Sequence, residues 1–235
     1  MSDSRAELLN AAWQIVVESF GFDDPGGPPS RQANAKILDQ LKAADIAARA
    51  GMTTGAFYNR WPNREAFLDD FLDYALSVDR SPTFAALTAA FERVRGLDYV
   101  QQTLELGRID IEMVASNPSF AIQTHLWSLM RSRTDIGDRM RTMYADFRSP
   151  LIPVYEAVLA GLGRELRPPF TMDQLANLLN ALSEGLTMQV VTGGEGAPHP
   201  DLMGLALIAL LPGVTRPIGD DRDLFDLVES ELDSG

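Results

Sequence analysis

The stretch DIAARAGMTTGAFYNRW, residues 45–61, says more about the fold than any other part of the chain. Two short helical segments meet within it at Gly51, and glycine readily adopts the left-handed conformation that ends a helix. Two helices joined by a turn of about three residues that contains glycine form a helix-turn-helix. The stretch therefore predicts this motif, although the same spacing also occurs in ordinary helical proteins.

The two helices divide their side chains into an inner and an outer set. Small Ala47 and Ala50 let the helix axes approach, and Ile46, Met52 and Phe57 fall where they can pack between them. Short or hydrogen-bonding side chains near a helix N-terminus suit entry into the DNA major groove. The alternative is that Tyr58 is a half-buried aromatic residue and that Arg60 is a solvated charge. The residues predicted to face outwards are Thr53, Thr54, Gly55, Ala56, Tyr58, Asn59 and Arg60.

Charge is spread unevenly along the chain. Twenty basic and 33 acidic residues give a net charge of −13, which disfavours a nucleic-acid partner because affinity for phosphate comes from Lys and Arg. Residues 217–235, however, carry a local charge of −6, whereas residues 40–64 carry +3. The positive island therefore coincides with the predicted helix-turn-helix, and its basic residues are Lys42, Arg49, Arg60 and Arg64.

Composition and motifs exclude several other classes of site. The chain has no Cys, and its two His, His125 and His199, lie far apart, so we predict no disulfide and no metal site. No serine-hydrolase, zinc-protease, P-loop or dinucleotide motif occurs, so we predict neither an enzyme nor a cofactor. The N-terminus lacks a signal-peptide pattern, and the apolar run 202–214 is too short to span a bilayer. We therefore expect a soluble, cytoplasmic protein.

Helical periodicity recurs throughout the chain and strand patterns hardly occur, so the sequence predicts an all-α fold. We expect two domains, residues 1–78 and 79–235. One expected helix, 135–161, contains Pro150 and Pro153, where it can bend. The other expected helices are 4–20, 33–50, 53–61, 63–78, 82–95, 98–115, 118–133, 171–192, 200–213 and 221–232.

Three motifs, DIAxxAGM (45–52), GAFYxxW (55–61) and NREAFL (63–68), resemble the TetR family of bacterial transcription regulators. The resemblance implies that Tyr58 and Arg64 contact DNA phosphates, and we include Lys42 of the positive island among the DNA contacts. It also implies that the major groove is met by Thr53, Thr54, Gly55, Ala56 and Asn59. Ala56 departs from the usual Thr or Ser, which removes a hydrogen bond but leaves contact with a thymine methyl group open.

The segment 22–40 is longer than the connection that family members usually have between their first two helices. In addition, Leu41 and Lys42 stand where a capping Ser or Thr and its follower are expected. One interpretation is a solvated loop followed by an early helix start. The other is that Arg31 or Lys36 supplies further contacts with the DNA backbone.

Two helices near the C-terminus, 171–192 and 201–213, are apolar nearly all round. A helix that is apolar on every side must be covered on every side, so we expect a homodimer in which a second copy covers part of each helix. The alternative is that both helices are internal to one chain. The residues predicted at the dimer interface are Leu175, Leu178, Leu179, Leu182, Leu186, Leu205 and Ile208.

The family resemblance implies that the second domain binds an effector that controls DNA release. Aromatic and flexible side chains on the middle helices favour an apolar or aromatic small molecule over a metal or a nucleotide. Core packing is the alternative role for each of these side chains. We predict a repressor rather than an activator because family members usually repress, with a helical enzyme or a protein-binding module as the remaining alternatives. The predicted ligand-binding residues are Phe120, Trp127, Met130, Tyr144 and Phe147.

Overall fold

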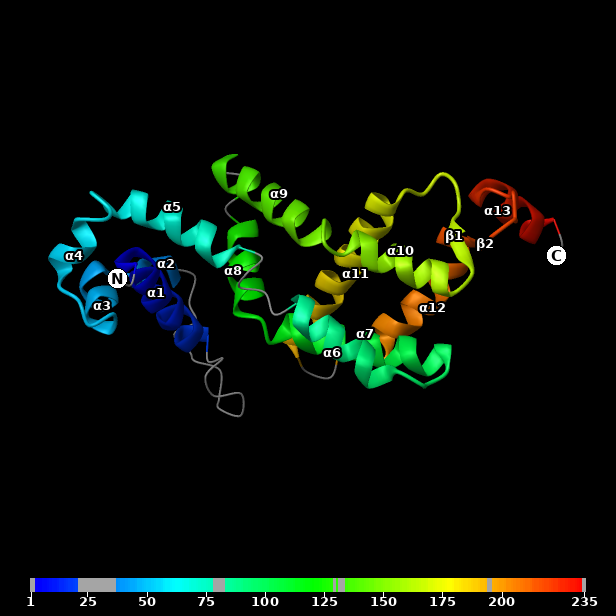
Figure 1. Cartoon of the computed structure of the whole chain (residues 1–235), viewed down its shortest axis with the longest axis horizontal. Coiled ribbons are helices and arrows are strands. Elements are labelled where there is room, and N and C mark those ends of the chain that lie inside the picture. The colour runs from blue at the N-terminus through cyan, green and yellow to red at the C-terminus, as the bar shows by residue number, and fades with distance from the viewer. Residues whose placement is uncertain are drawn as a thin grey trace. The chain divides into compact units, whose positions relative to one another are not determined.

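The computed structural model describes residues 3–20, 37–77, 83–128, 130, 134–193 and 196–233. These residues form helices connected by turns, together with two strands of three residues each (Figure 1). The chain divides into two compact units. The first unit comprises Met1–Ser81 and Ser116–Met143, and the second comprises Pro82–Ala115 and Tyr144–Gly235. The predicted all-α class is confirmed.

The first unit is held together by an apolar core to which every one of its longer helices contributes. Its helices are α1 (Ser4–Phe20), α2 (Ile37–Gln40), α3 (Ala43–Arg49), α4 (Thr54–Tyr58), α5 (Arg64–Ala75), α8 (Pro118–Trp127) and most of α9 (Thr134–Arg148). Full burial of one large apolar side chain stabilises a fold by roughly 1.5–3 kcal/mol. The largest fully buried side chains of this core are Leu8, Val16, Leu41, Ile46, Phe57, Phe67, Phe71, Leu72, Ile122, Leu126, Ile136 and Met140.

Polar contacts explain why residues 116–143 group with the N-terminal helices. Arg139 of α9 donates to the Asp69 carboxylate of α5 at 3.0 Å and also pairs with Asp73. The Ser119 hydroxyl of α8 donates to the Ala75 carbonyl at 3.1 Å. The domain boundary expected from the sequence, between residues 78 and 79, differs from this grouping into compact units. That residues 1–78 bind DNA and residues 79–235 bind the effector stays a prediction.

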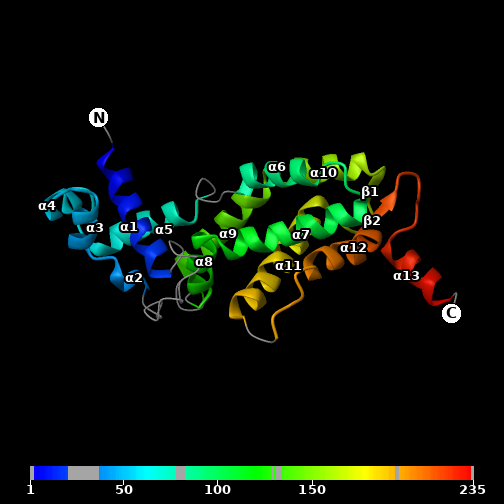
Figure 2. The ribbon, with the colours of Figure 1, turned by 90° about the horizontal axis from the view of Figure 1, so that it is seen from below.

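The second unit is built around α7 (Tyr99–Ala115), which contacts α6, α11 and α12. Figures 1 and 2 both show α7, α11 and α12 side by side. A Cβ atom added to Gly107 of α7 would lie 2.5 Å from the backbone nitrogen of Gly204 on α12, so the two helices touch through their backbones. Within the described ranges, no helix is long and apolar enough to cross a membrane. The other helices of the unit are α6 (Thr83–Val94), α10 (Ile152–Gly161), α11 (Met172–Thr192), α12 (Leu202–Val214) and α13 (Leu224–Leu232).

Helix boundaries differ from the sequence prediction at three places. The predicted helix 33–50 is interrupted at Leu41 and Lys42, where Lys42 is extended (φ −94°, ψ 135°) and precedes α3; residues 33–36 lie outside the described ranges. The predicted helix 118–133 ends at Trp127. The predicted helix 135–161 is two helices, α9 and α10, because Pro150 has no N–H to continue the first of them.

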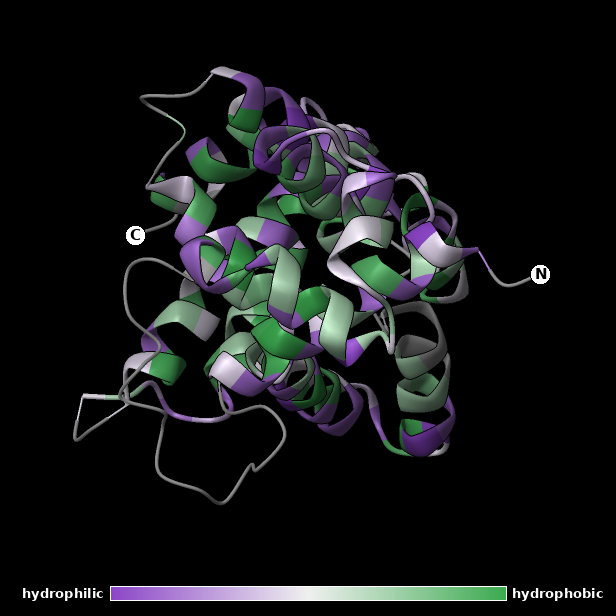
Figure 3. Ribbon diagram, turned by 90° about the vertical axis from the view of Figure 1, so that its left-hand side faces the viewer, coloured by the Kyte–Doolittle hydropathy of each residue, from purple (hydrophilic) through white to green (hydrophobic). Residues whose placement is uncertain are grey.

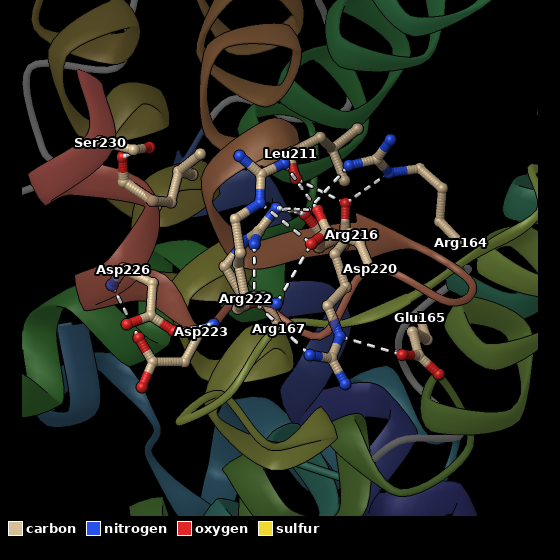
Figure 4. A network of polar contacts seen from close by, with 12 residues as sticks. Arg164, Glu165, Arg167, Leu211, Arg216, Asp220, Arg222, Asp223, Asp226 and Ser230 are labelled. Carbon is tan, nitrogen blue, oxygen red and sulfur yellow. Dashed lines mark hydrogen bonds and ion pairs between the residues drawn. The ribbon is translucent and has the colours of Figure 1, made fainter. Parts of the chain in front are cut away.

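Two short strands, β1 (Arg164–Leu166) and β2 (Thr215–Pro217), pair antiparallel, with Glu165 opposite Arg216. The sequence does not predict them because three residues are too few for a recognisable alternation. Figure 4 shows the polar network beside them, in which Arg164 donates to the Thr215 hydroxyl at 2.7 Å. Helices account for the remainder of the fold, and the hydropathy colouring in Figure 3 shows hydrophilic and hydrophobic residues interspersed along them.

Arg167 occupies the buried centre of this network, with only 3% of its side chain exposed. Its guanidinium donates to the backbone carbonyls of Arg222 at 2.8 Å and Thr215 at 3.3 Å, and an Asp220 oxygen lies 3.8 Å away. Arg222 also donates to Asp220 at 2.9 and 3.0 Å. These hydrogen bonds from the Arg222 side chain are the main cause that lowers the pKa of Asp220 to about 2.

Asp220→Asn should reduce the stability of the protein at neutral pH, because it removes the carboxylate beside buried Arg167. The folded pKa of Asp220 lies below its ordinary value of 3.8, so the wild-type carboxylate stabilises above that value and loses its contribution as the pH falls towards about 2. Urea unfolding at a series of pH values measures this. The variant should therefore lose less stability than wild type over that interval. Asp221→Asn, which removes the same charge at an exposed position, is the control, and equal effects of both changes would contradict the prediction.

Candidate DNA-binding site

Helices α3 and α4 meet at a turn whose geometry depends on Gly51. Its φ of +67° lies in the left-handed region, which a side chain would strain. The Gly51 and Met52 amides donate to the Ala48 and Ala47 carbonyls at 3.1 and 2.8 Å and close the end of α3. Thr53 then caps α4, since its hydroxyl accepts from the Ala56 amide at 3.2 Å. The predicted helix-turn-helix is thus present.

The inner side of α4 is fixed by aromatic contacts. Phe57 is 2% exposed, and its ring centroid lies 5.1 Å from that of Trp61 and 5.0 Å from that of Phe67 on α5. The Trp61 indole donates to Asp70 at 2.6 Å, and Arg5 of α1 donates to the same carboxylate at 2.9 Å. The hydrogen bond from Arg5 is the main cause that lowers the pKa of Asp70, with a further contribution from Trp61. Helix α4 therefore packs on α5 through Phe57, and the residue Trp61 that follows it is joined through Asp70 to α1.

The outer side of α4 is open. Tyr58 is 54% exposed, although its ring contacts the edge of Phe57 at a centroid distance of 5.4 Å. Ala56 is half-buried. The other residues predicted to face outwards are all exposed: Thr53, Thr54, Gly55, Asn59 and Arg60.

Three of the predicted DNA contacts border one hollow. Lys42, Tyr58 and Arg64, together with Leu41, Ala43 and Phe57, line an open depression of about 110 Å³. The Arg64 guanidinium is held by the Leu38 carbonyl at 2.6 Å and by the Asp39 carboxylate at 3.2 Å, so α2 positions it. Two cations and a phenol at one place suit a phosphate group.

Two other basic residues of the positive island are engaged elsewhere. Arg60 donates to the Ser4 hydroxyl of α1 at 2.6 and 3.0 Å. Arg49 forms two hydrogen bonds with the Glu18 carboxylate, one of them at 2.6 Å, and these lower the pKa of Glu18. The island therefore offers DNA fewer uncommitted charges than its local charge of +3 implies. Arg31 and Lys36, the alternative backbone contacts, lie outside the described residues.

The structure distributes the predicted ligand-binding residues over both compact units. Phe120 is 6% exposed and meets Trp127 edge-on at a centroid distance of 6.4 Å, while Met130 is 38% exposed; all three belong to the first unit. Tyr144 and half-buried Phe147 belong to the second unit, where the Tyr144 hydroxyl and Glu184 are 3.1 Å apart. Core packing accounts for Phe120. A shared role in one pocket stays a prediction for the set.

The residues predicted at the dimer interface also differ in the fraction of each residue that is exposed and could contact a second copy of the chain. Leu175 and Leu186 are 3% and 8% exposed and belong to apolar clusters of their own chain. Leu178, Leu179 and Leu182 are half-buried against those clusters, and Ile208 is half-buried. Leu205, by contrast, is 50% exposed, and Val191 on α11 and Leu202 on α12 are 52% and 39% exposed.

Two short helices are joined here by a turn that contains glycine, and the second helix has a packed inner side and an open polar outer side. This arrangement is typical of helix-turn-helix DNA-binding proteins. Two family models match the chain. Residues 34–71 match the model of bacterial regulatory proteins of the tetR family, and residues 115–210 match the BetI-type transcriptional repressor C-terminal domain. The chain belongs to the TetR family of transcriptional regulators and is not an enzyme.

Solved structures support the same fold. A chain from Saccharomonospora viridis, described as a transcriptional regulator in complex with choline, is similar with a TM-score of 0.54 and 17% identity, covering 92% of this chain and 100% of that one. A chain from Rhodococcus sp., described as a TetR-family transcriptional regulator, is similar with a TM-score of 0.52 and 18% identity, covering 89% and 96%. No curated protein matches. At these identities, the likeness concerns the fold alone.

Proposed function

We propose that this regulator is a repressor that binds an inverted-repeat operator as a homodimer and leaves it when a small organic effector binds. The observation that carries the DNA-binding part is the gathering of Lys42, Tyr58 and Arg64 around one hollow next to the open side of α4. Contacts with phosphates position a protein on DNA, and contacts with base edges select the sequence. This site offers residues of both kinds side by side.

Each predicted DNA contact has a role in this proposal. Tyr58, Lys42 and Arg64 bind phosphates, whereas Thr54 and Asn59 meet base edges in the major groove. Ala56, Gly55 and Thr53 allow close approach, with Ala56 suited to a thymine methyl group. Arg60, which Ser4 holds at the start of α1, adds positive charge at the rim of the site.

The dimer part of the proposal rests on exposed apolar side chains on α11 and α12. Val191, Leu202 and Leu205 are each at least 39% exposed, which leaves apolar area for a second copy to cover. A two-fold dimer places two recognition helices about one DNA turn apart, so each copy reads one half of an inverted repeat. Light scattering at micromolar concentration tests it, and a monomeric mass would contradict it.

The effector part has two supports. The C-terminal match is to a repressor domain of the BetI type, and the similar chain from Saccharomonospora viridis was solved with choline, a small organic molecule. An effector releases DNA only through different affinities for the DNA-binding and the free conformation. A preference of about 100-fold corresponds to roughly 2.7 kcal/mol. Gel shifts with organic compounds, metals and nucleotides test it, and release by metals or nucleotides alone would contradict it.

The proposal as a whole predicts the outcome of one experiment. Selection of bound sequences from random DNA with the purified full chain should yield an inverted repeat whose halves lie about one helical turn apart. Binding to the selected DNA should weaken steeply as salt rises, because phosphate contacts release counterions. Recovery of no sequence above background would refute DNA-binding by this chain, and recovery of a single half-site would refute the dimer.

A further inference from the structure

Helix α7 carries a buried carboxylate, Asp110, which belongs to neither the proposed DNA-binding surface nor the proposed dimer surface. One of its oxygens, Oδ2, is buried and has no hydrogen-bond partner among the described residues. Ser183 of α11 hydrogen-bonds to the same side chain, and burial raises the pKa of this carboxyl. Within the described ranges, Asp110 thus has one hydroxyl as its partner and no positively charged side chain beside it.

A second buried polar group without a hydrogen-bond partner lies on α11, the helix that carries Ser183. Thr187 follows Ser183 by one turn of α11, so both hydroxyls lie on one face of that helix. The Thr187 side chain is 0% exposed, and its hydroxyl oxygen has no hydrogen-bond partner among the described residues. Three side-chain atoms in those ranges are buried without a partner, and two of them, on Asp110 and Thr187, come from this pair of packed helices.

Tyr155 of α10 is the third polar residue near Asp110. Burial, and then the negative charge of Asp110, raise the pKa of Tyr155 to about 12. Its hydroxyl is therefore neutral at physiological pH and can donate, and the face of a tyrosine ring attracts cations. Helices α7, α10 and α11 thus each supply a group to one polar cluster.

Leaving such groups without partners destabilises a fold by roughly 1–3 kcal/mol each, so each one in a native protein calls for an explanation, such as a bound ion or molecule. Elsewhere in the described chain, carboxylates with a shifted pKa pair with arginines: Asp70 with Arg5, Asp201 with Arg108, and Asp220 with Arg222. Asp110 differs from these carboxylates because its positive partner is missing. An incoming cation would supply that partner.

We propose that Asp110 is the counter-ion for a positively charged effector, whose ammonium group is surrounded by Tyr155, Ser183 and Thr187. This inference rests on the proposed function and names the chemical class of its effector, a small alkylammonium ion. A metal ion fits less well, because the described residues contain no group of three His, Asp or Glu side chains able to hold one. Ile111 and Leu186, next to Asp110 and Thr187 in the sequence, belong to an apolar cluster formed by helices α7, α11 and α12.

The first experiment measures cation binding by the full chain without DNA. Tetramethylammonium, choline and benzyltrimethylammonium are tested by thermal shift and calorimetry, alongside the neutral isostere of choline in which carbon replaces nitrogen. At least one cation should raise Tm, and the isostere should not. Asp110→Asn should weaken that cation by about tenfold or more, because it removes the only charge in the cluster. Glu112→Gln, which removes one charge from an exposed position on the same helix, should leave the affinity unchanged.

A second variant tests the proposal independently in case Asp110→Asn does not fold. Thr187→Val keeps the side-chain volume and removes the hydroxyl that lacks a partner, so the stability of the unliganded protein should not fall while cation affinity falls several-fold. A purely structural Thr187 would show the opposite pattern. Circular dichroism establishes that each variant is folded.

The outcomes separate this inference from the proposed function. If no cation of the panel binds, or if Asp110→Asn binds it as tightly as wild type, the cation site is refuted even when operator binding and release by another compound are intact. If the chain binds no operator, the proposed function fails while cation binding can still be measured. The expected result is that Asp110→Asn binds operator like wild type and is no longer released by the cation.

Discussion

Gly107→Ala should be among the most destabilising single changes in the second unit. The added Cβ atom would lie 2.5 Å from the nitrogen and 2.9 Å from the Cα of Gly204, and both are backbone atoms that no side-chain rotation can move away. Helices α7 and α12 would have to separate, which also disturbs the cluster of Ile111, Leu186 and Met203. We expect the free energy of unfolding to fall by about 3 kcal/mol or more, at the upper end of what overpacking costs.

Chemical unfolding of the purified variant measures this decrease. The matched control is Gly137→Ala in α9, where the added Cβ would meet only the end of the Arg141 side chain at 3.7 Å. That change should stabilise by about 0.5–1 kcal/mol, since alanine is the better helix former. Equal stability of the Gly107 variant and wild type would show that the two helices do not touch through their backbones.

Tyr58→Phe should weaken binding to the selected operator and to unrelated DNA by about the same factor. The variant cannot donate a hydrogen bond to a charged phosphate, and such a bond is worth roughly 1.5–3 kcal/mol, or about tenfold or more in affinity. Lys42→Ala should do the same and also lower the slope of affinity against salt by about one, because one phosphate is no longer neutralised. Tyr99→Phe, at an exposed tyrosine of the second unit, is the control and should have no effect.

Substitutions of Thr54 or Asn59 should instead change which base pairs are preferred, by roughly 1–3 kcal/mol at the position affected. Gel shifts with the selected operator and with single-base variants distinguish the two patterns. If Tyr58→Phe leaves both affinity and salt dependence unchanged, the proposed docking of α4 on DNA is wrong.

The helix-turn-helix could be predicted because its determinants are local. Gly51 at the turn, the cap at Thr53 and the apolar spacing of Ile46 and Phe57 all lie within one short stretch, and the structure uses each of them. The interruption at Lys42 has no local signal, because Leu41 and Lys42 stand where a capping Ser or Thr and its follower would mark the start of a helix.

Features that depend on distant parts of the chain escaped prediction. The close approach of Gly107 and Gly204 joins residues that no local pattern connects. Asp110 is one acidic residue among several on an amphipathic helix, and only its burial beside Ser183 of a distant helix makes it unusual. Aromatic character, which selected the predicted ligand-binding residues, does not distinguish a pocket from a core, as buried Phe120 illustrates.

Helix α4 has only five residues and would not be stable as an isolated helix. Its folding depends on Phe57 and on the rings that surround it, whereas Thr54 and Asn59 are exposed and pack against nothing that the core requires. Changes at exposed positions of this kind usually alter stability by less than about 0.5 kcal/mol. After a gene duplication, one copy could therefore acquire a new set of target promoters by substitutions at these positions, with its fold and its effector response inherited intact.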